Sequence, residues 1–125
     1  MTQFFLVLTG GAIGSVGRWL TGRGMLAMFG PAYPYGTLAV NLVGGLLMGV
    51  LVATLARLAM PVDNIRLFFA TGVLGGFTTF SAFSLDTVTM LQRGDLGVAL
   101  GYALLSVVGS VLALFAGLYL VRAVA

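Results

Sequence analysis

Charged residues are scarce in this 125-residue sequence. Six Arg and three Asp carry all of its charge, 7% of the residues, whereas 60% of the residues are hydrophobic. Soluble domains carry roughly 25% charged residues because their surface faces water. The composition therefore indicates a membrane protein.

Cysteine and histidine are missing altogether. Without cysteine the chain has no disulfide, thiolate metal site or cysteine nucleophile, and without histidine it lacks the commonest general base and zinc ligand. Most enzyme classes are excluded on these grounds. The net charge of +3 comes from arginines scattered along the chain, without a clustered basic face, so no nucleic-acid partner is expected.

Four long apolar stretches, separated by short polar segments, dominate the sequence. About 20 apolar residues at 1.5 Å each cross a hydrocarbon core of roughly 30 Å, so each stretch predicts one transmembrane helix. The first stretch has no basic residue before its apolar run, which favours a retained helix over a signal peptide. The predicted fold is a single all-α transmembrane domain over residues 1–125, with spans at about 3–22, 35–57, 65–92 and 96–122.

The arginines divide evenly between the two sides of a chain with four spans. Three fall on each side, namely Arg57, Arg66 and Arg122 on one, and Arg18, Arg23 and Arg93 on the other. Orientation is normally set by an excess of Lys and Arg in the cytoplasmic loops. Equal numbers allow the chain to insert both ways and to pair as an antiparallel dimer; position-specific effects that fix one orientation are the alternative.

The third span carries the most informative stretch, in which Gly75-Gly76 precede Thr78-Thr79. Glycine and threonine are poor helix formers, so we expect the helix to break near residues 75–79. Non-helical backbone at that depth is tolerated only where it is buried in protein or lines a cavity, and carbonyls freed there commonly coordinate a cation. A glycine-rich kink healed by the threonine hydroxyls is the structural alternative.

Polar side chains inside the predicted spans form a second signal. They are Asn41 in the second span and Ser106 and Ser110, which share one face of the fourth. Packing alone explains them if Asn41 makes an interhelical hydrogen bond and the serines bond back to the backbone. Taken together they form the strip of donors that a dehydrated anion needs.

Phe80 and Phe83 are spaced i to i+3 and project from one helix face. Aromatic rings in membrane helices usually pack or face lipid, but their edges are partly positive and can accept an anion without trapping it. Asp86 is the one acid within a span, and we expect it to pair with Arg18 at the interface; a proton relay is the alternative.

Glycines spaced by four residues recur in three of the predicted spans. Small residues let helix backbones approach closely in lipid. We therefore expect three pairs to pack helices together: Gly10 with Gly14, Gly45 with Gly49, and Gly97 with Gly101.

These motifs together resemble the Fluc (CrcB) family of bacterial fluoride channels. The resemblance covers all four spans. Its most specific parts are the GTLxVN stretch at residues 36–41 and the GGxTTFSxFS stretch at residues 75–84. One departure is Ala82, where the family often has a hydroxyl residue.

The resemblance implies an antiparallel, dual-topology homodimer with two pores, each built from both subunits, and a structural sodium ion at the dimer centre. Arg18 would stand at a pore vestibule, and the backbone carbonyls of Gly75 and Thr78 would bind the sodium. The residues that would line the pores or lie beside them are Asn41, Thr79, Phe80, Ser81, Phe83, Tyr102, Ser106 and Ser110.

In function, the resemblance implies a channel in the bacterial inner membrane that exports cytoplasmic fluoride passively and catalyses no reaction. Two other functions fit a short chain with four spans. A dual-topology small multidrug exporter needs an acid in its first helix, and this chain has none before Asp63. A non-transporting membrane assembly protein would leave the polar strip and the expected break without a purpose.

Overall fold

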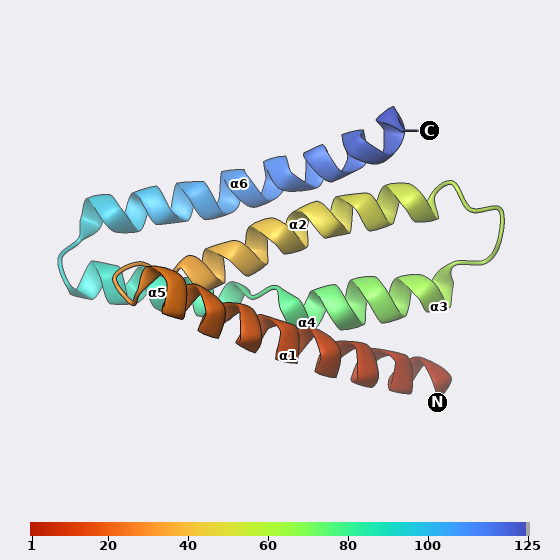
Figure 1. Ribbon diagram of the computed structural model, residues 1–125, viewed down its shortest axis with the longest axis horizontal. Helices are drawn as coiled ribbons and strands as arrows, with labels where there is room; N and C mark the ends of the chain where they lie inside the picture. Colours follow the sequence, from red (N-terminus) through yellow and green to blue (C-terminus); the bar gives the residue numbers. More distant parts are fainter. Residues whose placement is uncertain (125) are drawn as a thin grey trace.

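The computed structural model describes residues 1–124, which are helical almost throughout (Figure 1). In chain order the helices are α1 (Thr2–Phe29), α2 (Tyr35–Leu55), α3 (Asp63–Arg66), the π-helix η1 (Leu67–Leu74), α4 (Gly75–Phe77), α5 (Phe80–Gln92) and α6 (Leu96–Ala123). Within these residues four stretches are long and apolar enough to cross a membrane: Thr2–Phe29, Tyr35–Leu55, Asp63–Gln92 and Leu96–Ala123. The chain is a multi-pass, all-α membrane protein, as predicted.

The spanning stretches alternate in direction. Both termini and the α2–α3 connection lie at one end of the molecule, and the α1–α2 and α5–α6 turns lie at the other, which we call the turn end (Figure 1). Gly30 (φ 79°) and Gly94 (φ 84°) stand in these two turns in the left-handed region that glycine enters without strain. α1 extends to Phe29, seven residues beyond the predicted end near residue 22, and stops where Gly30 leaves the helical conformation.

The third spanning stretch consists of several helical segments. Between α4 and α5 the backbone of Thr78 (ψ 159°) and Thr79 (ψ 124°) is extended. Thr79 Oγ1 accepts a hydrogen bond from Ala82 N at 3.1 Å, so this side chain caps the start of α5. Thr78 and Thr79 are called the extended segment below.

Glycines bring helices together at backbone distance. A Cβ atom added at Gly10 would lie 2.5 Å from Phe68 O, and one added at Gly45 would lie 2.7 Å from Ser110 O. α1 therefore lies directly on η1, and α2 lies directly on α6.

Gly97 and Gly101 do not follow this pattern. Within residues 1–124, a Cβ atom at either position would meet no atom within 4 Å, and both glycines are exposed on α6. The helix packing expected of this pair is therefore not made inside the described chain.

Candidate functional site

A groove of about 430 Å³ lies beside the extended segment, and we call it the central groove. Residues from α2, the extended segment, α5 and α6 line it. Six of the eight predicted pore residues are among them: Asn41, Thr79, Phe80, Phe83, Ser106 and Ser110. Thr78, which was predicted as a sodium ligand, also lines the groove. The fold thus gathers at one place polar and aromatic side chains that are far apart in the sequence.

Asn41 holds the extended segment through two hydrogen bonds. Thr79 N donates to Asn41 Oδ1 at 2.8 Å, and Asn41 Nδ2 donates to Thr79 O at 2.9 Å. An asparagine amide carries two N–H donors, so one of them is left for another acceptor. Asn41 therefore makes hydrogen bonds between two spans, as expected if it only packs the helices together. It also lines the groove, where its second N–H is unused.

The two phenylalanines form the aromatic part of the groove. The ring centroids of Phe80 and Phe83 are 5.4 Å apart, with their planes at 49°. Phe83 is half-buried, whereas Phe80 is 75% exposed although it stands in the third span. The outer ring is thus free to face lipid or a second protein surface.

Ser106 and Ser110 place two hydroxyls on the α6 side of the groove. Ser106 Oγ is buried and has no hydrogen-bond partner among residues 1–124. An unsatisfied buried polar group costs about 1–3 kcal/mol. The Ser106 hydroxyl is therefore a donor that a ligand in the groove would satisfy.

Two predicted pore residues are not among those that line the groove: Ser81, which is exposed, and Tyr102. Ser81 Oγ is 3.3 Å from Thr79 Oγ1. Tyr102 is fully buried, and its ring centroid is 5.3 Å from that of Phe83. In this chain both residues contact lining residues and do not line the groove themselves.

The predicted ion pair between Arg18 and Asp86 is wrong. Tyr102 Oη donates to Asp86 Oδ2 at 2.9 Å, and Arg18 Nε donates to Gly76 O at 3.1 Å. In a continuous helix Gly76 O would accept from the N–H four residues later, but the extended segment removes that bond. The Gly76 carbonyl, which has lost its helical donor, accepts a hydrogen bond from Arg18 instead.

Two more carbonyls lose their helical donors at the extended segment. Thr79 N would donate to Gly75 O in a continuous helix, and here it donates to Asn41. Ala82 N would donate to Thr78 O, and here it donates to Thr79 Oγ1. Carbonyls freed in this way coordinate sodium in other membrane proteins, so the carbonyl oxygens of Gly75 and Thr78 fit a sodium ion as ligands.

A second cavity, of about 440 Å³, lies between the α1–α2 turn and α5, and we call it the turn chamber. Thr37 and Asp86 line it, and Thr37 also lines a smaller cavity of about 180 Å³ together with Arg18. Thr37 is not among the site residues predicted from the sequence. Its spacing of four residues from Asn41, which puts both on one helix face, is the signal that could have found it.

Comparison with known proteins shows the family of this chain. The sequence matches the family described as CrcB-like protein, Camphor Resistance (CrcB), over residues 5–118. The chain belongs to the CrcB family. The membership predicted from the motifs is thereby confirmed.

Among similar proteins of the CrcB family, several are named fluoride-specific ion channel FluC. Those from Mesorhizobium japonicum and Agrobacterium fabrum are 52% and 54% identical to this chain over 122 residues, and the alignments cover 98% of each chain. One from Caulobacter vibrioides is 49% identical over 125 residues, covering 99% of this chain and 98% of its own.

The two stretches on which the CrcB resemblance rests meet at one point of the structure. Residues 36–41 end with Asn41, residues 75–84 contain the extended segment, and the hydrogen bonds between Asn41 and Thr79 join them. The signature of the family thus coincides with the centre of the groove.

Proposed function

We propose that this chain is the subunit of a fluoride-selective channel that lets cytoplasmic fluoride leave the cell by passive electrodiffusion. The observation that carries the proposal is the central groove, where Asn41, Ser106 and two phenylalanines meet. Its relatives, about half identical, are named fluoride-specific ion channels. The protein is a channel, not an enzyme, and we place it in the bacterial inner membrane.

Fluoride holds its water tightly, so a pore must replace that shell with other donors. The central groove offers the second N–H of Asn41, the hydroxyl of Ser106 and the edges of the phenylalanine rings. All of these groups are neutral. Several weak sites let the ion enter and leave, whereas a full positive charge at the same place would hold it.

The membrane potential supplies the direction of flux. An inside-negative potential drives a monovalent anion outward with about 2.3 kcal/mol per 100 mV. Fluoride that enters as neutral HF dissociates inside the cell and becomes subject to this force. The channel therefore exports fluoride without a nucleotide or a proton relay.

The structure weakens the exporter alternative further. A cation exporter needs an acid that faces its substrate, and α1 contains none. Asp86, the acid within the third span, accepts a hydrogen bond from Tyr102. The residues that line the groove include hydrogen-bond donors and no acidic side chain, which favours an anion over a cation.

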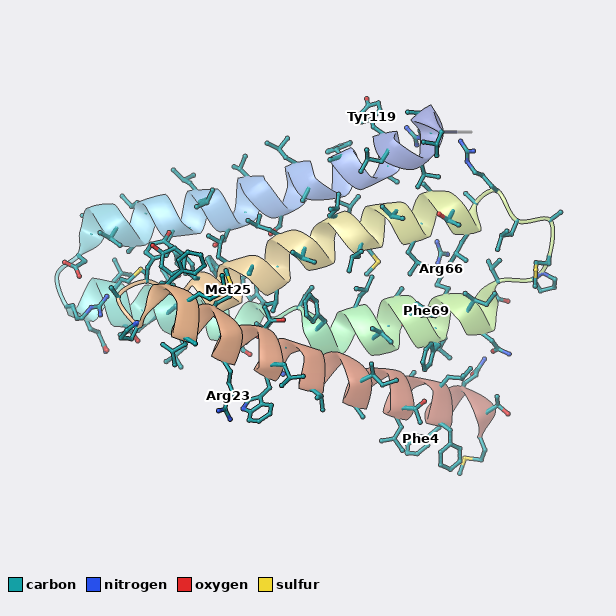
Figure 2. All side chains as sticks on the ribbon, in the orientation of Figure 1. Phe4, Arg23, Met25, Arg66, Phe69 and Tyr119 are labelled. Carbon is teal, nitrogen blue, oxygen red and sulfur yellow. The ribbon has the colours of Figure 1, made fainter. Side chains whose placement is uncertain are left out.

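Replacing Phe80 or Phe83 by Ile should lower fluoride efflux from proteoliposomes about tenfold or more, because Ile is apolar but has no positive ring edge. Phe4→Ile is the matched control, since Phe4 is 59% exposed and points away from the other helices (Figure 2). Size-exclusion chromatography would show that the variants fold and assemble like the parent. Parental efflux through both Phe80→Ile and Phe83→Ile would show that the rings only pack.

The channel is proposed to be an antiparallel, dual-topology homodimer. A second copy would cover the Phe80 ring, which a single chain leaves 75% exposed beside the groove. Arg18 is bound to Gly76 inside the bundle, so the bias between the two ends is three arginines against two: Arg57, Arg66 and Arg122 at one, and Arg23 and Arg93 at the other. Such a small bias favours insertion in both orientations.

Orientation can be read directly because the chain has no cysteine. A single cysteine added at the C-terminus should be labelled by a membrane-impermeant maleimide in about half of the molecules in intact cells. A short Lys tail at the C-terminus should fix one orientation and abolish fluoride efflux. Co-expression with a copy in which the exposed Arg57, Arg66 and Arg122 are changed to Gln should restore it; full efflux from a population locked in one orientation would contradict the antiparallel dimer.

A structural sodium ion is proposed at the dimer centre, held by the carbonyls of Gly75 and Thr78. Support comes from the diverted donors, since Thr79 N binds Asn41 and Ala82 N binds Thr79 Oγ1. Carbonyl oxygens from two copies would satisfy a monovalent cation in a dry site. The ion would hold the two extended segments together.

Sodium bound to the native dimer should stabilise it by about 2–3 kcal/mol at a concentration a hundredfold above its dissociation constant. The thermal unfolding midpoint in detergent should therefore fall when N-methyl-D-glucamine replaces Na⁺. Gly75→Val should abolish this sodium dependence, and Gly24→Val should keep it, because in the described chain a Cβ at Gly24 would meet nothing within 4 Å. Equal midpoints with and without Na⁺ in the parent would rule out the site.

A further inference from the structure

A row of aromatic rings runs from the α1–α2 turn to the central groove. Successive ring centroids are 5.6 Å, 5.3 Å and 5.4 Å apart along the series Tyr33, Tyr102, Phe83 and Phe80. All three separations lie within the range of about 4.5–7 Å in which aromatic pairs attract beyond simple burial. The row thus connects a turn residue with both rings of the groove.

Tyr102 is the most tightly held member of the row. It has no exposed surface, and its hydroxyl donates to Asp86 Oδ2 at 2.9 Å. Tyr33 packs against it at an interplanar angle of 87°, which is the edge-to-face arrangement, and Phe83 packs against it at 40°. Tyr33 and Phe83 both contact the buried cluster that contains Tyr102. One fully buried ring therefore lies between Tyr33 and Phe83 and contacts each of them.

The turn fixes the place of Tyr33. It lies between Pro31 and Pro34, each of which holds its own φ near −65°, and its carbonyl accepts a hydrogen bond from Tyr35 N at 2.8 Å. Burial raises the pKa of the Tyr33 phenol above its ordinary value, and the neighbouring Tyr35 raises it further. The ring is therefore neutral at physiological pH and is presented to Tyr102 by a stiff segment.

We propose that Tyr33 is a positioning residue for fluoride permeation, which sets the orientation of Phe83 by packing against Tyr102. Tyr33 lines the turn chamber and is not among the residues that line the central groove, so it acts at a distance from the ion. A ring edge attracts an anion and a ring face repels it, so a rotation of Phe83 would change permeation without altering the composition of the groove. This role rests on the proposed channel function.

The test places 4-fluorophenylalanine at position 83 and follows its ¹⁹F resonance in the detergent-solubilised dimer, with fluoride efflux measured on the unlabelled proteins. Tyr33→Leu should shift or broaden the resonance and lower efflux about three- to tenfold, because one edge-to-face contact is lost. Tyr33→Phe, which keeps the ring, should match the parent in both measurements. Phe29→Leu is the control at the same end of the molecule. Phe29 is 52% exposed and contacts Tyr35, so the rings of Tyr35 and Tyr33 separate it from Tyr102.

A dimeric Tyr33→Leu protein with the parental resonance would overturn the proposal, whether or not its efflux falls, and so would an equal shift in Phe29→Leu. If Tyr33→Leu does not assemble, Tyr33→Met, which fills similar volume without a ring, takes its place under the same criteria. If the parent itself carries no fluoride, the channel function fails, whereas the resonance still decides whether Tyr33 orients Phe83.

Discussion

The two hydrogen bonds between Asn41 and Thr79 decide how the third span crosses the membrane. In a bilayer no water can satisfy a free backbone group, so extended residues in a span survive only with protein partners. Asn41 supplies an acceptor and a donor to Thr79, the Thr79 hydroxyl caps α5, and Arg18 binds the Gly76 carbonyl. With these partners in place, the carbonyls of Gly75 and Thr78 are left without their helical donors, and a groove lies beside them.

Close helix packing brings these partners within reach. Gly10 lies against the backbone of η1, which places Arg18, two turns further along α1, beside α4. Gly45 lies against Ser110, which brings α6 and its hydroxyls to the groove. Larger residues at these glycines would push the helices apart and separate the donors of the groove from one another. Packing and function are therefore coupled through backbone contact.

Much of this arrangement follows from the sequence, because its strongest signals are local. The length of the apolar stretches predicts four spans. Of the residues expected to interrupt the third span, Thr78 and Thr79 are extended, whereas Gly75 and Gly76 are helical in α4. The partners of Arg18 and Asp86 depend on tertiary geometry, and for that reason charge alone paired them wrongly. The contact between Tyr33 and Tyr102 likewise joins distant segments, which no residue spacing records, and no pattern in the sequence predicted the π-helix η1.

Selective passage of fluoride through the neutral central groove is the central claim, and efflux from proteoliposomes tests it most directly. Vesicles loaded with either fluoride or chloride, with valinomycin present to dissipate the potential, would be monitored with ion-selective electrodes. The account predicts rapid fluoride efflux and chloride efflux no faster than from protein-free vesicles. Chloride efflux equal to that of fluoride would contradict it, because the groove would then not distinguish fluoride from another small anion.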